Sequence, residues 1–123
     1  MRLLSIVFLT LISFAAMGQS QYLKVAGDWE GSISVQETDI KVVFHIKYDG
    51  EALSATMDSP DQNAFGIKVD EVSFKEGILK MKSNQVQGDY EGTLNNNTVD
   101  GKWKLGQQTF DLKLSKKVKK RSS

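Results

Sequence analysis

The amino-acid sequence predicts an all-β fold, a single antiparallel meander of eight or nine short strands that closes into a small barrel. Two observations support this prediction. From Gly27 onward, apolar residues recur at every second position, which is the period of a strand, and no stretch shows a helical stripe. Turn-forming residues separate these stretches at hairpin spacing. A two-sheet β-sandwich is the alternative, because alternation alone does not distinguish the inner face of a barrel from that of a sandwich.

Residues 1–18 have the organisation of a secretory signal peptide. Arg2 supplies a positive charge, an apolar segment covers residues 3–16, and small residues precede a cleavage site between Gly18 and Gln19. The apolar segment is shorter than the roughly 20 residues that span a membrane. We therefore expect a protein exported to the periplasm or the extracellular space, which meets the membrane only through this signal peptide before cleavage.

The rest of the chain suits one domain that is stabilised by its core, because there is no cysteine. We expect the barrel over residues 19–115 and a basic C-terminal tail over residues 116–123. Residues 19–115 contain ten lysines against fifteen Asp and Glu residues, a net charge of about minus five. An acidic body repels nucleic-acid phosphates, so we expect no nucleic-acid partner.

In the first half of the domain, the clearest alternation covers residues 40–48 and follows a predicted turn at Glu37–Asp39. Asp49 and Gly50 then predict a two-residue hairpin turn, since glycine adopts positive φ without cost. A third strand carries Leu53 to Met57. The polar stretch Asp58–Gly66 breaks the pattern and is predicted to be the longest loop.

In the second half, strands are predicted over residues 67–70, 71–75, 78–82, 86–94, 99–105 and 110–114. Glu76-Gly77, Asn95–Asn97 and Gly106 mark the turns between them. Several glycines fall inside strand patterns, where they weaken a sheet unless the backbone bends or packs closely. These glycines are predicted to be corner positions of a barrel.

One motif repeats inside the domain. Residues 28–33 (Asp-Trp-Glu-Gly-Ser-Ile) match residues 89–94 (Asp-Tyr-Glu-Gly-Thr-Leu), and residues 100–103 form a looser copy. The repeat places Trp29, Tyr90 and Trp103 beside glycines. These aromatic residues either line a ligand cavity or fill a tapering core.

A second group of candidate contact residues surrounds the only proline, Pro60. It contains Asp58, Ser59, Asp61 and Gln62. They either contact a ligand or partner, or they have a structural role. In the structural interpretation Asp58 and Asp61 bind backbone amides in a tight turn and Gln62 bonds the next strand.

No catalytic or metal-binding constellation is evident. The single histidine, His45, lies on the less apolar face of a strand, where we expect a solvated ring. The hydrolase motif Gly-x-Ser-x-Gly is absent, so Ser59, His45 and Asp58 do not predict a triad. One histidine without cysteine gives no transition-metal site, and no calcium loop or phosphate-binding loop is present. We expect no enzymatic activity, no cofactor and no metal; an enzyme that used Ser59 would lose its activity in Ser59→Ala.

Several motifs together resemble a known family. They are a Gly-x-Trp-x-Gly opening at residues 27–31, Val-Phe-His-Ile at residues 43–46, Met-Asp-Ser-Pro-Asp-Gln at residues 57–62 and Tyr-x-Gly at residues 90–92. The chain resembles the non-catalytic N-terminal β domain that precedes the catalytic domain in secreted α/β-hydrolases of the serine aminopeptidase type, mainly from Bacteroidetes. The resemblance spans about Gly27 to Leu114. The triad of that catalytic domain has no counterpart among these residues.

The resemblance implies an accessory or binding role outside the cytoplasm. The opening Gly27-x-Trp29 is also similar to that of lipocalin-type barrels, although the arginine expected near the last strand is missing. Two functions follow. The first is a lipocalin-like barrel that binds a small apolar or amphipathic ligand, with the Asp58–Gly66 loop beside its mouth. The second is a docking module for a separately encoded secreted hydrolase or envelope protein.

Overall fold

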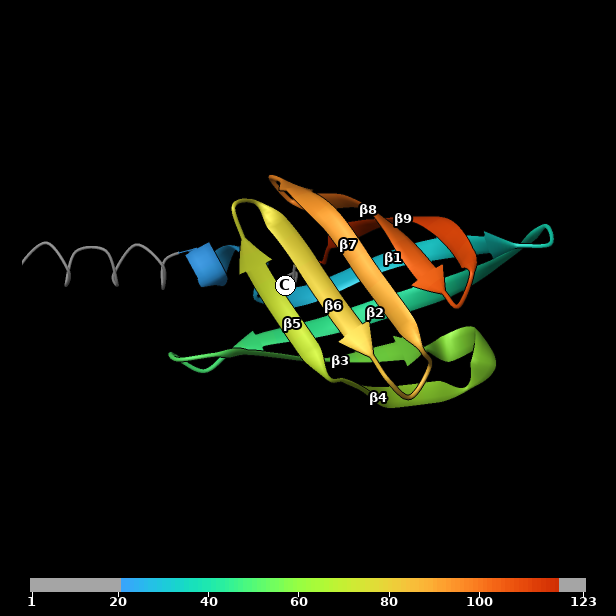
Figure 1. Ribbon diagram of the computed structural model, residues 1–123, viewed down its shortest axis with the longest axis horizontal. Coiled ribbons are helices and arrows are strands. Elements are labelled where there is room, and N and C mark those ends of the chain that lie inside the picture. The colour runs from blue at the N-terminus through green and yellow to red at the C-terminus, as the bar shows by residue number, and fades with distance from the viewer. Residues whose placement is uncertain (1–20, 118–123) are drawn as a thin grey trace, which may run out of the picture.

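Nine antiparallel strands form one sheet in the computed structural model, which describes residues 21–117 (Figure 1). The strands are β1 (Gly27–Val35), β2 (Thr38–Tyr48), β3 (Leu53–Ser59), β4 (Ala64–Val69), β5 (Glu71–Lys75), β6 (Ile78–Ser83), β7 (Gly88–Asn95), β8 (Thr98–Leu105) and β9 (Gln108–Lys116). The predicted all-β meander is confirmed. The signal peptide predicted over residues 1–18 and the tail beyond residue 117 lie outside the described residues.

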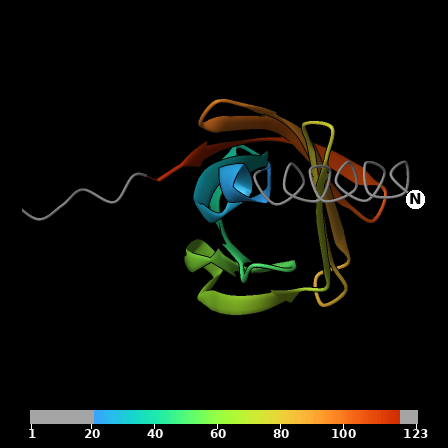
Figure 2. The same cartoon turned by 90° about the vertical axis from the view of Figure 1, so that its left-hand side faces the viewer.

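The sheet curls into a nearly closed barrel, and the view in Figure 2 shows this curl from one end. The first and last strands meet, because β1 pairs with β9 at Trp29↔Lys116 and Glu30↔Ser115. Every other pair of neighbouring strands in this sheet is consecutive in the chain. The strand order is β4-β3-β2-β1-β9-β8-β7-β6-β5. The β-sandwich alternative is not adopted.

The two edges of the sheet are β4 and β5, which only Asp70 separates in the chain. No ladder joins these edges within the described residues. Strand β5 pairs with β6, and two hydrogen bonds hold the end of β4 and the following Asp70 beside the same strand. The Asp70 amide donates to the Lys82 carbonyl at 2.7 Å, and the Ser83 hydroxyl donates to the Lys68 carbonyl at 2.7 Å. The seam of the barrel is therefore in the middle of the chain and not at its ends.

Two predicted turns differ from those in the structure. The first turn is Gln36-Glu37, with φ of 51° and 67°, so β2 begins two residues before the predicted strand. The predicted two-residue hairpin at Asp49-Gly50 is wrong, because four residues connect β2 to β3. The Asp49 carboxylate accepts hydrogen bonds from the amides of Glu51 and Ala52, each at 2.8 Å, and this local bonding lengthens the turn.

The predicted Asp58–Gly66 loop is also shorter than expected. Strand β3 continues through Ser59, a single 3₁₀ turn η1 (Pro60–Gln62) follows, and β4 already begins at Ala64. Pro60 suits the first position of this turn because its φ is fixed and its missing amide is not needed there. Asn63 adopts the left-handed conformation with φ of 55° and ends the turn.

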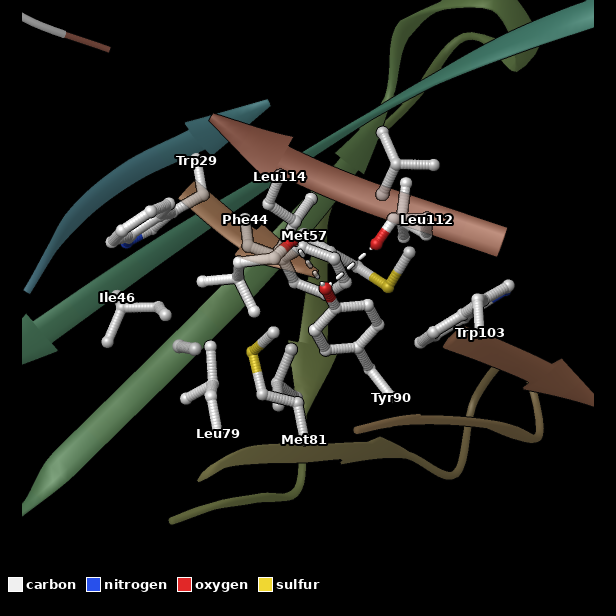
Figure 3. Close-up of a cluster of buried hydrophobic side chains, with 14 of the residues drawn as sticks. Trp29, Phe44, Ile46, Met57, Leu79, Met81, Tyr90, Trp103, Leu112 and Leu114 are labelled. Carbon is white, nitrogen blue, oxygen red and sulfur yellow. Dashed lines mark hydrogen bonds between the residues drawn. The ribbon is translucent and has the colours of Figure 1, made fainter. Parts of the chain in front are cut away.

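Alternate residues of the strands point inward and fill the barrel with large side chains (Figure 3). Phe44 packs against Tyr90 and Trp103, with ring centroids 5.9 Å apart in both pairs. A Cβ atom at Gly88 would overlap with the ring of Trp103, so glycine at this position makes room for the indole. Aromatic rings beside glycines thus fill the centre of the barrel.

A short helix over residues 21–25 covers the end of the barrel near the start of β1 (Figures 1 and 2). Val25 is fully buried, and its carbonyl accepts a 2.9 Å hydrogen bond from the indole N–H of Trp29. Tyr22 packs edge-to-face on Tyr48, with ring centroids 5.5 Å apart. These contacts pack the helix against this end of the barrel.

Candidate functional site

An apolar cavity of about 250 Å³ occupies the end of the barrel opposite the helix, where the β1–β2 turn, η1, the β6–β7 connection and the β8–β9 turn lie (right-hand side of Figure 1). Its wall consists of buried side chains from five strands: Ile33, Val42, Met57, Ile67 and Trp103. Period-two alternation explains this wall, since each of these residues takes an inward position on its strand. The cavity is a continuation of the core.

The rim of this cavity consists of partly exposed apolar side chains, which are Val35, Ile40, Val86, Leu105 and Phe110. Three polar residues complete the lining: Ser59, Gln62 and Gln108. None of the lining residues carries an ionisable group. Concave apolar surface with a few placed polar groups is typical of small-molecule sites.

The predicted contact residues around Pro60 divide into two groups. Ser59 is buried and Gln62 is exposed, and both line the cavity, where the Ser59 hydroxyl donates a 2.8 Å hydrogen bond to Gln62 Oε1. Asp58 and Asp61 do not line it. Their carboxylates accept hydrogen bonds from backbone amides, Asp58 from Gly66 at 2.8 Å and Asp61 from Lys41 at 2.9 Å.

The three predicted aromatic residues also take different positions (Figure 3). Trp29 is completely buried at the helix-covered end. Tyr90 is buried at the centre, where its hydroxyl donates to the Leu112 carbonyl at 2.9 Å and burial raises the pKa of the phenol. Trp103 alone lines the cavity. The structure therefore brings Trp103, Ser59 and Gln62 together, while Trp29 and Tyr90 fill the core.

His45 has an arrangement that the sequence did not suggest. Its Nδ1 lies 2.8 Å from Asp28 Oδ1 and its Nε2 lies 2.7 Å from Asp58 Oδ2, on the outer face of the sheet. The expectation of a solvated ring is wrong, since 32% of the side chain is exposed and both nitrogens have carboxylate partners. A neutral imidazole donates only one hydrogen bond, so two ionised carboxylates are matched by the imidazolium, in which both nitrogens donate.

Charge pairing within this Asp28–His45–Asp58 bridge shifts two protonation equilibria. The hydrogen bond to Asp58, followed by that to Asp28, raises the pKa of His45 above its usual value. Partial burial of Asp58 opposes ionisation of its carboxyl. The Gly66 amide and the His45 ring outweigh burial, and the pKa of Asp58 is lowered. The bridge ties β1, β2 and β3 together next to the segment that carries Ser59.

Ser59 and His45 lie on opposite faces of the sheet. The Ser59 hydroxyl is directed into the cavity and bonds Gln62, whereas both nitrogens of His45 contact carboxylates outside. A serine nucleophile requires a base within hydrogen-bond reach. In the structure His45 does not take that position relative to Ser59.

Two larger hollows are open depressions whose lining residues include several charged side chains. One, of about 610 Å³, lies over β5 to β9 and presents alternating charges such as Lys80, Glu91 and Lys102. Lys80 lies opposite Glu91 in the β6–β7 ladder, and Glu91 lies opposite Lys102 in the β7–β8 ladder. The other, of about 810 Å³, lies beside the helix and includes Lys24 and Glu76. Opposite charges on neighbouring strands are an ordinary feature of a solvated sheet face, so the apolar cavity is the better candidate site.

No family model matches this chain, and neither the curated proteins nor the solved structures include a match. Between residues 21 and 117, no three His, Cys, Asp or Glu side chains are arranged to hold a metal ion. The one helix in this part of the chain is too short to cross a membrane.

Proposed function

We propose that this protein is an exported, non-catalytic barrel that binds a small apolar or amphipathic ligand in its end cavity. The observation that carries the proposal is the 250 Å³ cavity itself, which has a continuous apolar wall and only three polar residues at its lining. Displacing water from such a surface onto an apolar ligand is favourable by roughly 25 cal/mol per Å² of apolar area buried. Export is proposed from the signal-peptide pattern of residues 1–18.

Filling the cavity tests this function. Val86 lies on the rim, in the connection between β6 and β7, and Val86→Phe adds bulk there. Val72 is a matched control, because it is partly buried on the inner side of β5 but does not line the cavity. We expect octanol or naphthalene to bind the native protein and Val72→Phe, and to bind Val86→Phe at least tenfold more weakly.

Isothermal titration calorimetry gives the affinities, and tryptophan fluorescence gives a second readout because Trp103 lines the site. Thermal melting of both variants establishes that each is folded. Absence of binding to the native protein for both probes contradicts the proposal, as does equal binding by the two variants.

A second candidate function, docking to a secreted hydrolase or envelope protein, is favoured by a different observation. Phe65 projects from edge strand β4 with 62% of the residue exposed. An edge strand presents unpaired backbone groups, and an exposed aromatic side chain beside them suits a protein contact. Co-purification from the native envelope, compared between the native protein and Phe65→Ser, tests this candidate.

A further inference from the structure

We infer that the end cavity selects uncharged ligands, namely short amphiphiles with a neutral polar group such as an alcohol or a carboxamide. This inference rests on the proposed binding function and adds the chemical class of the ligand. The observation behind it is that the thirteen lining residues include ten apolar side chains, one hydroxyl and two carboxamides, and no acid, lysine, arginine or histidine.

The two carboxylates that adjoin the polar lining residues Ser59 and Gln62 are bonded elsewhere. Asp58 precedes Ser59 in β3, but alternation directs its carboxylate to the outer face, where it meets His45 Nε2 and the Gly66 amide. Asp61 precedes Gln62 in η1 and accepts from the Lys41 amide. An ionic head group in the cavity would therefore have no partner of opposite charge among the lining side chains.

The energetic consequence follows from desolvation. Moving an unpaired ion out of water costs several kcal/mol in a real protein interior, whereas a neutral polar group that finds a hydrogen bond costs far less. Each 1.4 kcal/mol corresponds to a tenfold change in affinity. An ionic head group that keeps some contact with water at the open rim pays only part of this cost. We therefore expect neutral head groups to bind at least tenfold more tightly than ionic ones.

The polar lining residues match a neutral head group. The Ser59 hydroxyl donates to Gln62 Oε1, which leaves the amide N–H groups of Gln62 as donors at the rim. Gln108, at the start of β9, supplies a second carboxamide. Hydroxyl and carboxamide groups of a ligand both donate and accept hydrogen bonds, so either finds partners here.

The size of the cavity limits the length of the ligand's apolar chain. Its volume of about 250 Å³ lies below the range of roughly 300–1,000 Å³ that is usual for drug-sized ligands. The helix over residues 21–25 and the packed rings of Trp29 and Tyr90 block extension toward the other end of the barrel. A short alkyl chain fits this space better than a long acyl chain.

A matched series tests the inference with the full chain. Octanol, octanamide, octanoate and octylamine share one alkyl length and differ in head-group charge at pH 7. We expect octanol and octanamide to bind, and octanoate and octylamine to bind at least tenfold more weakly by calorimetry. Equal or tighter binding of either ion overturns the selectivity but leaves the binding function standing. Absence of binding by all four overturns the binding function and the selectivity with it.

A second experiment tests whether an added cation at the rim improves binding of an anionic ligand. Gln108→Lys places a cation at the rim and should strengthen octanoate binding at least tenfold relative to octanol binding by the same variant. Gln21→Lys makes the same charge change in the helix at the opposite end and should alter neither affinity. Equal strengthening of octanoate by both variants would mean that overall charge, not the cavity lining, determines the preference.

Discussion

The Nε2 atom of His45 lies 2.7 Å from Oδ2 of Asp58, across two neighbouring strands on the outer face of the barrel. Oδ1 of Asp28 lies 2.8 Å from the other ring nitrogen, Nδ1. Nearby, Glu30 of β1 forms a separate set of ion pairs, with Lys41 at 3.1 Å and Lys117 at 3.2 Å. Protonation of His45 therefore affects mainly the link between β1, β2 and β3.

Stability should depend on pH through His45. Its pKa in the folded state is raised above the ordinary value of about 6.5, so its contribution is fully present below pH 6.5 and is lost as the pH rises through the raised pKa. His45→Gln removes this contribution. Urea unfolding between pH 6 and pH 9 should show a difference in free energy of unfolding between native and variant protein that shrinks as the pH rises. A difference that grows with pH contradicts this prediction.

Asp58→Asn should lower the pKa of His45. The amide keeps an oxygen for the Gly66 N–H but loses the negative charge that stabilises the imidazolium. His45 is the only histidine, so proton NMR titration of an untagged protein reports it without assignment. Asp61→Asn is the control, because Asp61 bonds the Lys41 amide and should leave the titration unchanged. An unaltered pKa in Asp58→Asn would show that the contact does not persist in solution.

Tyr90→Phe should destabilise the barrel by about 1–2 kcal/mol, because the Leu112 carbonyl loses a buried partner. Tyr48→Phe removes the same hydroxyl group from an exposed bond to the Gly50 carbonyl at 3.0 Å, and should cost less than about 0.5 kcal/mol. Chemical denaturation of the two variants under identical conditions gives the comparison. Equal losses of stability in the two variants would mean that the Tyr90 hydroxyl is in contact with water and not buried.

Gly88→Ala should cost about 1–3 kcal/mol, because the new methyl group overlaps with the indole of Trp103. Phenylalanine lacks the ring atoms that this methyl group meets, so the cost should be smaller in a Trp103→Phe background. A double-mutant cycle measured by urea unfolding separates this steric coupling from the effect of each substitution alone. Additive losses in the cycle contradict the proposed overlap.

The sequence predicted the strands well because most of them bury only one face. The alternation of Val42, Phe44 and Ile46 determines which face of β2 points inward. The turn at Glu76-Gly77 was also predicted, because it contains a glycine with positive φ. Hydrophobic period is a local property of the chain. It therefore predicted the meander, and the glycines beside aromatic residues also indicated a filled barrel centre.

The register between strands was harder to predict, and the His45 bridge was missed for this reason. The Gln36-Glu37 turn sets Asp28 directly opposite His45. The four-residue connection between β2 and β3 sets Asp58 opposite Val43, diagonal to His45. A two-residue turn at Asp49-Gly50 would instead place Asp58 opposite Lys41. An error of two residues in one turn thus hides a cluster that depends on three strands.

The candidate cavity was predictable only in part. The sequence indicated Ser59, Gln62 and Trp103, but it grouped them with residues that point elsewhere. Asp58 and Ser59 are neighbours in the chain, yet they lie on opposite faces because β3 continues through them. Trp29 and Trp103 both face inward but lie toward different ends of the barrel (Figure 3). The position of a residue along the barrel axis depends on the stagger between neighbouring strands. Hydrophobic alternation carries no information about this stagger.

The pairing of β1 with β9 has a consequence for the order of assembly. Strands β1 to β4 and strands β5 to β9 are each built from consecutive hairpins, whose contacts are close in sequence and quick to form. Only the β1–β9 ladder brings together distant parts of the chain, so the entropic cost of loop closure is concentrated in that one step. Weakening this ladder should slow folding and leave two locally formed half-sheets as the intermediate to detect.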